Sequence, residues 1–277
     1  MPGDIRPRNK QGDSAMYLSC CVWALSAPEE SVLSDMKALG FRWIDIRPEF
    51  QKSSAARTAA RSLSLQVSSV AASYGLPEGA SLDSPDDLSR MEALSHLQGV
   101  AHQCKDLGGS AVYLVPGADG SKAALARYAE SLATAADRAA DLGISIGVEH
   151  FPGTALPSAA ATLEFIEAID HPNLGLLFDI GHVQISDEDP AGVIRRAGKR
   201  LAYVHLDDND GKGDLHWALL DGILTVETLR ETFLALKDID YNGAISLELS
   251  PQLDNPYEAL QRSRQIVLDC GSDYLSG

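Results

Sequence analysis

The sequence predicts an α/β protein that folds as a single (β/α)8 barrel. Strand-like and helix-like segments alternate eight times along the chain, which is typical of a parallel sheet covered by helices. A barrel of eight such units takes about 250 residues, so the 277 residues present do not require a second domain. Four strand-like segments also end in acidic residues or histidine, and functional residues of such barrels lie at the carboxyl ends of strands.

The predicted strands are mostly continuous apolar runs, as expected for parallel strands that are buried on both faces. In the first half of the chain they cover residues 16–25, 41–48, 63–72 and 110–117. In the second half they are the segments ISIGVEHFPG, LGLLFDIGHVQIS, LAYVHLDDNDGKGDLH and AISLELSP. Glycine or proline follows each of these last four runs and separates it from the next helix-like segment.

The helix-like segments carry start and stop signals. Ser26 and Ser84 each precede a proline and a pair of acidic residues, so we predict that both serines cap helices. Glycines such as Gly40, Gly108 and Gly143 mark helix ends. The predicted helices cover residues 26–40, 51–63, 84–109, 121–143, 156–170, 187–198, 225–239 and 255–269.

No linker or low-complexity segment interrupts this alternation, so residues 16–277 are predicted to form one barrel domain. Residues 1–15 are polar and lack the apolar core of a signal peptide, which predicts a flexible N-terminal leader. No apolar run reaches the ~18 residues of a membrane span. The four cysteines show no CxxC spacing, which favours reduced thiols. Together these features predict a cytoplasmic protein without a membrane partner.

The composition is strongly acidic, with 39 acidic against 23 basic residues and a net charge of −16. Nucleic-acid-binding domains usually present a basic face, so no nucleic-acid partner is expected. The acidity favours an uncharged or metal-bridged small substrate. The sequence leaves open whether the chain forms a homo-oligomer.

Four residues at predicted strand ends form a candidate metal site. Each follows an apolar run, and they are Glu149, Asp179, His205 and Glu248. The carboxyl ends of barrel strands meet at one face, so these side chains are expected to converge. Carboxylate oxygens and imidazole can together hold a divalent cation. The alternative for Glu149 is a buried ion pair with a neighbouring lysine or arginine.

Other polar residues are predicted to contact the substrate. His182 follows Asp179 by three positions, which places it where it can contact a substrate hydroxyl. The polar loop after the seventh predicted strand contains Lys212, Asp214 and His216. We expect this loop to cover the site and to offer these side chains to the substrate.

Arg47 and Glu49 lie at the end of the second predicted strand. Arg47 therefore either faces the pocket and binds substrate or forms a surface ion pair with Glu49. Together with Trp23 and Tyr74, these residues are expected to distinguish one reaction from another, whereas Trp43 is expected to pack in the core.

Two glutamates on opposite sides of a bound cation suit proton transfer next to a carbonyl group. The cation polarises the carbonyl and an adjacent hydroxyl, one carboxylate takes the α-proton, and the metal holds the resulting enediolate. The other carboxylate returns a proton to the opposite face or to the neighbouring carbon. Glu149 and Glu248 thus predict an isomerase or epimerase that acts on a small polyhydroxylated carbonyl compound.

The segments GVEH, FDIGH, VHLDDNDGKGDLH and LEL, in this order, resemble the xylose isomerase-like TIM-barrel superfamily of sugar phosphate isomerases and epimerases. The resemblance covers about residues 16–270. It implies one divalent cation, with Mn2+ preferred and Co2+, Mg2+ and Zn2+ as alternatives. It also implies that Glu149 and Glu248 act as the acid/base pair of ketose 3-epimerases and that His182 contacts a substrate oxygen. The implied metal ligands are Glu149, Asp179, His205 and Glu248.

The chain departs from this family in the loop after the seventh strand. Asp214, His216 and Gly222 match the family pattern D-x-H-x-x-x-G-x-G, but Leu220 replaces its first glycine. Epimerases carry a substrate-binding arginine a few residues after the strand-seven histidine, where this chain reads GKG. These differences argue against a simple psicose- or tagatose-type epimerase.

Three alternatives stay open. A lyase or dehydratase acting on an inosose, dehydroshikimate or a keto-glycoside would use the same metal site and expel a β-leaving group. Endonuclease IV, a trinuclear zinc DNA-repair enzyme, uses the same scaffold, but it needs histidines where this chain reads SSVAASYG and YLVPG. A non-catalytic barrel subunit is the third alternative, and the complete set of four ligands argues against it. The lack of a glycine-rich phosphate loop after strands seven and eight favours a non-phosphorylated substrate.

Overall fold

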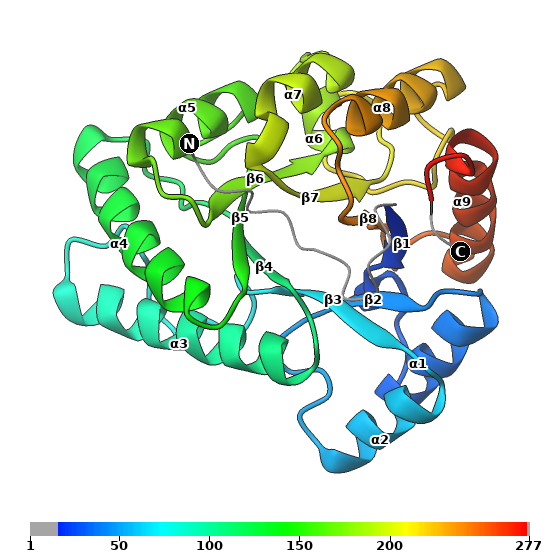
Figure 1. Cartoon of the computed structure of the whole chain (residues 1–277), viewed down its shortest axis with the longest axis horizontal. Helices are drawn as coiled ribbons and strands as arrows, with labels where there is room; N and C mark the ends of the chain where they lie inside the picture. The colour runs from blue at the N-terminus through cyan, green and yellow to red at the C-terminus, as the bar shows by residue number, and fades with distance from the viewer. Residues whose placement is uncertain (1–15, 276–277) are drawn as a thin grey trace.

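The computed structural model describes residues 16–275, and within them one sheet of eight parallel strands lies at the centre of a ring of helices (Figure 1). The predicted leader at 1–15 and the last two residues of the predicted barrel domain lie outside this range. The strands are β1 (Tyr17–Cys20), β2 (Trp43–Ile46), β3 (Gln66–Ala71), β4 (Ala111–Leu114), β5 (Ser145–Glu149), β6 (Leu174–Asp179), β7 (Leu201–Leu206) and β8 (Ala244–Leu247).

The strands pair in the order β1-β8-β7-β6-β5-β4-β3-β2, and every pairing is parallel. An isolated parallel bridge between Cys21 and Asp45 joins the ends of β1 and β2, so the first and last strands of this order also meet. The predicted single (β/α)8 barrel is therefore confirmed.

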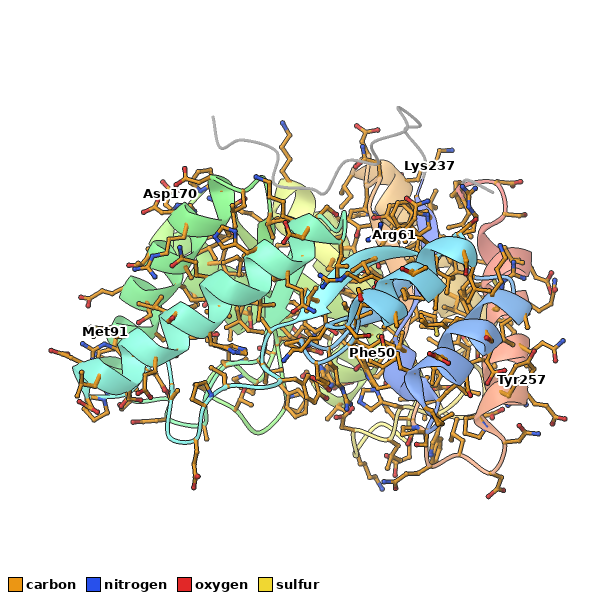
Figure 2. All side chains as sticks on the ribbon, turned by 90° about the horizontal axis from the view of Figure 1, so that it is seen from below. Phe50, Arg61, Met91, Asp170, Lys237 and Tyr257 are labelled. Carbon is orange, nitrogen blue, oxygen red and sulfur yellow. The ribbon has the colours of Figure 1, made fainter. Side chains whose placement is uncertain are left out.

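Helices cover the outer face of the sheet on all sides (Figure 1). They are α1 (Glu29–Ala38), α2 (Ser54–Ser62), α3 (Asp87–Asp106), α4 (Lys122–Ala140), α5 (Ala159–Ile169), α6 (Ile180–Ile185), α7 (Pro190–Ala197), α8 (Val226–Asp238) and α9 (Pro256–Gly271). Short 3-10 turns at η1 (Val22–Ala24) and η2 (Gly198–Arg200) supplement them. On the outer surface Met91 of α3 projects into solvent (Figure 2) and is 58% exposed.

Two predicted helix caps are wrong. Pro28 occupies the cap position of α1 and provides no side-chain bond, so Ser26 is not the cap. Asp86 caps α3 by accepting from the backbone N–H groups of Leu88 and Ser89, while Ser84 instead accepts from the N–H of Asp86. The predicted glycine stops are confirmed, because Gly40, Gly108 and Gly143 adopt φ of 87°, 84° and 71°. Only glycine takes this left-handed conformation without steric cost.

The structure also contains the helix α6 within the segment predicted to be the sixth strand. The chain turns directly from β6 into α6, because Asp179 accepts a 2.9 Å hydrogen bond from the backbone N–H of His182 and caps the new helix. This turn places His182 beside the strand ends, close to the side chains that end β5 and β6.

The interior of the barrel is packed with side chains, as in other barrels of eight strands. Tyr113 and Tyr203 stack there with ring centres 6.1 Å apart, and both rings meet the imidazole of His205 edge-on. Trp43 packs against Tyr17 at 4.6 Å between ring centres, which confirms its expected core role. These rings form the floor beneath the carboxyl-terminal face of the barrel.

Two further features bear on the environment of the protein. Within residues 16–275 no helix combines the length and the apolar character that a membrane crossing requires. Cys20, Cys21, Cys104 and Cys270 are free thiols.

Candidate metal centre

The four residues predicted to bind a metal ion come together at one point of the barrel. Glu149 ends β5, Asp179 ends β6 and is paired with His205 of β7, and Glu248 directly follows β8. Because β5, β6, β7 and β8 are successive neighbours in the sheet, their ends bring these side chains to one place. One donor atom from each of the four lies within 4.8 Å of all the others.

The arrangement of these donor atoms fits a cation. His205 Nδ1 lies 2.5 Å from Glu248 Oε2, 3.8 Å from Asp179 Oδ2 and 4.0 Å from Glu149 Oε1. His205 Nδ1 and Asp179 Oδ2 are buried, and neither has a partner with hydrogen-bond geometry in the described range. Buried polar atoms are normally satisfied, so a set of them aimed at one point is suited to a divalent ion.

The two glutamates differ in their electrostatic environment. Burial raises the pKa of Glu149 to about 8. Burial acts in the same direction on Glu248, but the adjacent His205 more than offsets it and lowers the pKa of Glu248 to about 2. Burial would lower the pKa of His205, yet Glu248 holds it well above its usual value. The site therefore combines a carboxylic acid, a carboxylate and an imidazolium at neutral pH.

Asp45 of β2 was not among the predicted site residues, yet it lies directly behind His205. Its Oδ2 is 3.6 Å from His205 Nε2, on the side of the ring opposite the cluster. Asp45 is fully buried and accepts hydrogen bonds from Tyr203 at 2.6 Å, from Ser19 at 2.9 Å and from Ser68. A carboxylate in this place orients the imidazole so that Nδ1 faces the other three donors.

A second group of polar residues lies next to the four-residue cluster. Asp214 Oδ1 is 3.2 Å from His182 Nε2 and 3.1 Å from His216 Nε2, so it bridges the two histidines. His216 Nδ1 lies 2.7 Å from Asp207, while His182 Nδ1 bonds the carbonyl of His150 at 2.9 Å and lies 3.7 Å from Glu149. The predicted substrate-binding residues His182, Asp214 and His216 are therefore joined in one network.

The charges of this network follow from its contacts. Burial would lower the pKa of His182, but Asp179 and Asp214 raise it to about 10. Burial and the neighbouring Asp179 raise the pKa of Asp207 to about 7, against the effect of His216. His182 is thus a hydrogen-bond donor at both nitrogens at neutral pH.

The loop after β7 is held in place by Asp208, which accepts backbone hydrogen bonds from Gly222 at 2.7 Å and from Leu224 at 3.0 Å. A side chain on Gly222 would come within 2.0 Å of the carbonyl oxygen of Asn209, so only glycine fits there. Leu220 keeps a left-handed backbone with φ of 69° at the position where the family pattern has glycine. Lys212 is exposed on this loop, and the structure does not bring it into the cluster.

Trp23, Arg47 and Tyr74 lie at the mouth of the site, after β1, β2 and β3. Trp23 Nε1 donates a 2.9 Å hydrogen bond to Glu248 Oε1. The guanidinium carbon of Arg47 lies 4.0 Å from the ring centre of Tyr74 and 5.1 Å from that of Trp23. Arg47 forms no ion pair with Glu49 in the described part of the chain, so the surface ion pair considered from the sequence is absent there.

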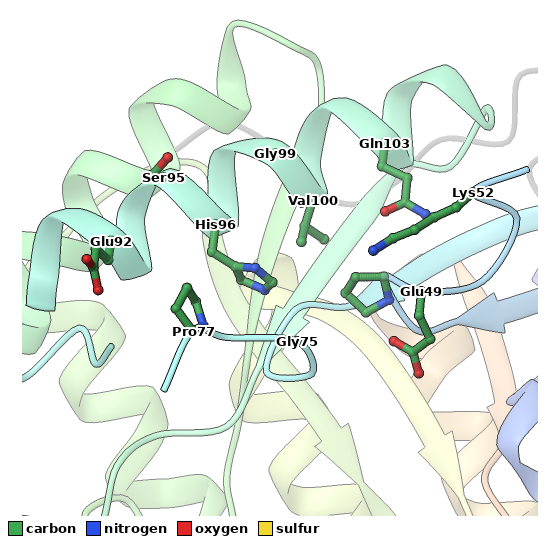
Figure 3. Close-up of a pocket in the computed structure, with 11 residues that line it drawn as sticks. Glu49, Lys52, Gly75, Pro77, Glu92, Ser95, His96, Gly99, Val100 and Gln103 are labelled. Carbon is green, nitrogen blue, oxygen red and sulfur yellow. The ribbon is translucent and has the colours of Figure 1, made fainter. Parts of the chain in front are cut away.

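Glu49 instead lines a separate groove of about 540 Å³ between α3 and the loops after β2 and β3 (Figure 3). In Figure 3 the side chain of His96 reaches from α3 toward the loop of Gly75 and Pro77, and Lys52 and Gln103 lie at the other end. None of the four cluster residues lines this groove, so it is distinct from the candidate metal centre.

Comparison with known proteins agrees with this architecture. The chain is 28% identical over 152 residues to an inosose dehydratase of Geobacillus thermodenitrificans, with 49% of this chain and 51% of the dehydratase aligned. It is 26% identical over 243 residues to a probable ketose 3-epimerase of Synechocystis sp., with 79% and 78% aligned. The chain thus spans about half the length of the dehydratase it matches.

The fold is shared with the IolI protein, whose crystal structure contains a zinc atom. The two superpose with a TM-score of 0.77 and 20% sequence identity over 95% of this chain and 100% of the other. A family model that describes the xylose isomerase-like TIM barrel matches residues 33–266. The chain therefore belongs to the xylose isomerase-like TIM barrel family.

Proposed function

We propose that this protein is a divalent-metal-dependent sugar isomerase or epimerase that removes a proton α to a carbonyl group. The observation that carries the proposal is the pairing of Glu149 and Glu248, two buried glutamates with opposite pKa shifts, across a cluster completed by Asp179 and His205. Titratable pairs whose pKa values are pushed apart are typical of acid/base sites. The similarity to a probable ketose 3-epimerase supports the same reaction class.

Glu149, Asp179, His205 and Glu248 would hold the cation, for which we propose Mn2+ before Co2+, Mg2+ or Zn2+. When bound, it would act as a Lewis acid that polarises the substrate carbonyl and a neighbouring hydroxyl. The rest of the reaction falls to the side chains of this protein, which bind and orient the substrate and move its protons.

In the proposed reaction one glutamate takes the α-proton, and the other returns a proton to the opposite face or to the adjacent carbon. Glu248 is held for this task by the Trp23 N–H on Oε1, which leaves Oε2 directed toward His205. His182 donates to a substrate hydroxyl through Nε2. Because Asp214 now accepts from that nitrogen at 3.2 Å, the substrate would compete with Asp214 for it.

The pKa shifts predict that metal affinity rises with pH. Glu149, with a pKa of about 8, and His205, with a raised pKa, must both lose protons before they can bind a cation. Between pH 6 and pH 8, each displaced proton should strengthen apparent Mn2+ affinity about tenfold per pH unit. Calorimetric titration of chelator-treated protein at three pH values measures this. Affinity that is constant over the interval would contradict the assigned protonation states.

Asp45 should support metal binding without touching the metal. The change Asp45→Asn keeps the shape of the side chain but removes the charge behind His205, so Mn2+ affinity is expected to fall about 10- to 100-fold. The same change at Asp106, an exposed residue of α3, serves as the matched control and should have no effect. Equal Mn2+ affinities for the two variants would show that Asp45 does not orient His205.

A lyase is the second candidate, because the similarity to an inosose dehydratase favours it. It would share proton abstraction and differ only in the loss of a β-leaving group from the enediolate. We place a nuclease below both. The strands β3 and β4 end in Ala71 and Leu114, where the trinuclear zinc site of endonuclease IV needs histidines, and the net charge is −16. We further propose a cytoplasmic location with neither nucleic-acid nor membrane partners, and leave homo-oligomerisation open.

The test is hydrogen–deuterium exchange at the α-carbon, followed by NMR in D2O. A panel of ketoses, inososes and keto-glycosides is incubated with the protein, with and without Mn2+. We expect Mn2+-dependent exchange with one class of compound. The product then shows whether that compound was epimerised, isomerised or dehydrated. Exchange at the same rate with and without Mn2+, or no exchange with any of the three classes of compound, would count against the proposal.

A further inference from the structure

Arg47 lies near the four-residue cluster but is not part of it. It follows β2 and lies in the stack of Trp23, Arg47 and Tyr74 described above, whose two rings have centres 6.0 Å apart. Trp23 donates to Glu248, so Arg47 is separated from the proposed acid/base pair by a single side chain.

Most of the N–H donors of the Arg47 guanidinium form no hydrogen bond within the described residues. Nη2 donates to the hydroxyl of Tyr74 at 3.2 Å, whereas Nε is buried and has no partner among residues 16–275. Within the same range no carboxylate forms an ion pair with Arg47, although acidic residues outnumber basic residues by 39 to 23 in the chain. A guanidinium has five N–H donors, and buried donors of a charged group are normally satisfied.

The shape of the stack restricts what can satisfy these donors. The guanidinium lies over the rings of Tyr74 and Trp23, so a ligand can accept hydrogen bonds only at the edges of the guanidinium plane. A planar carboxylate can accept two parallel hydrogen bonds from such an edge. In the proposed reaction the carbonyl end of the substrate faces the cluster, so an acidic group that reaches Arg47 lies at the end remote from the carbonyl.

We propose that the substrate of this site is an acidic sugar derivative, a polyhydroxylated carbonyl compound with a carboxylate at the end remote from the carbonyl, and that Arg47 binds this carboxylate. The inference rests on the proposed function, because it assumes that the carbonyl end faces Glu149 and Glu248. The acidic composition alone favoured an uncharged substrate. The guanidinium of Arg47, which has no ion-pair partner among the described residues, acts on a ligand at the mouth more strongly than the screened charges spread over the surface.

The experiment compares ligands that differ only at the remote end. Dissociation constants of D-fructose, D-fructuronate and D-fructose 6-phosphate are measured by calorimetry on the Mn2+-loaded protein. D-Fructuronate should bind at least about tenfold more tightly than D-fructose, as expected for a bidentate charge-assisted contact. Arg47→Met should reduce this ratio to about 1, and Arg47→Lys should give an intermediate ratio because it keeps the charge without the planar fork.

Arg61→Met is the matched control. Arg61 is an exposed residue on the outer surface of α2 (Figure 2), so its replacement removes the same charge far from the site and should keep the wild-type ratio. Thermal melting of each variant verifies that it is folded. Because a carboxylate can also bind Mn2+ directly, only the part of the preference that disappears in Arg47→Met is assigned to Arg47.

Three results would overturn the inference. The first is a wild-type ratio of 1 or below. The second is an equal loss of affinity for D-fructose and D-fructuronate in Arg47→Met, because Arg47 would then only support Trp23. The third is a preference for D-fructose 6-phosphate over D-fructuronate, which would make a phosphate the group recognised. Mn2+-dependent exchange on D-fructose without any anion preference would leave the proposed function intact and remove only this inference.

Discussion

Glu248→Gln is expected to abolish most of the α-proton exchange of this protein while leaving it folded. The glutamine keeps the size of the side chain and can still accept from the Trp23 N–H, but it cannot take up a proton. Loss of a positioned acid/base group lowers turnover by about 100- to 10,000-fold. The exchange rate should be measured at saturating Mn2+, so that weaker cation binding does not account for the loss.

The matched control for this variant is Glu227→Gln, which makes the same change at an exposed position in the first turn of α8. Its exchange rate should equal that of the wild type, and both variants should melt as cooperatively as the wild type. Exchange by Glu248→Gln within a factor of two of the wild-type rate would remove Glu248 from the acid/base pair.

His205→Ala should have the largest effect on metal binding. His205 Nδ1 lies within 4.0 Å of all three carboxylates of the cluster, and it is the one nitrogen donor of the four residues. In the proposed site its loss removes a metal ligand rather than a supporting contact. Mn2+ affinity should therefore fall further than the roughly 10- to 100-fold that a supporting residue accounts for.

His102→Ala provides the comparison, since His102 is exposed on α3 and lies outside the cluster. Elemental analysis after gel filtration should find metal in this control and not in His205→Ala. Equal metal content in the two variants would exclude His205 as a ligand. A melt of His205→Ala is needed in parallel, because Asp45 and Glu248 both lose their cationic neighbour.

The sequence predicted the fold and the four cluster residues because both depend on local patterns. Each cluster residue directly follows or ends a buried apolar run, and the geometry of a barrel then brings consecutive strand ends together. Nothing beyond the identity of the strands was needed to place Glu149, Asp179 and Glu248 near one another. The register that pairs Asp179 with His205 follows from the same geometry.

Asp45 could not be predicted in the same way. Asp45 is distant in sequence from His205, and within the segment FRWIDIRP it is simply a polar residue in a strand. Its contact with His205 depends on side-chain directions across the barrel interior, where β2 and β7 are not neighbours. An acidic residue flanked on both sides by buried isoleucines was the available signal, since buried charges need partners.

The residues that cap the helices also could not be predicted from the sequence pattern. Two serines that precede prolines were candidate caps, yet at the start of α3 it is the carboxylate of Asp86 that accepts hydrogen bonds from two backbone N–H groups. Likewise Asp179 caps α6, although the sequence predicted it only as a metal ligand. Asp179 thus caps a helix and belongs to the candidate metal site, and the strand pattern indicated only the second of these.

Metal-dependent proton abstraction is tested by titrating chelator-treated protein with Mn2+ and measuring bound metal and α-proton exchange on the same samples. We expect one Mn2+ per chain and an exchange rate that rises in proportion to bound metal and levels off at one equivalent. Exchange at full rate without metal, or a chain that binds no Mn2+ at all, would contradict metal-dependent proton abstraction.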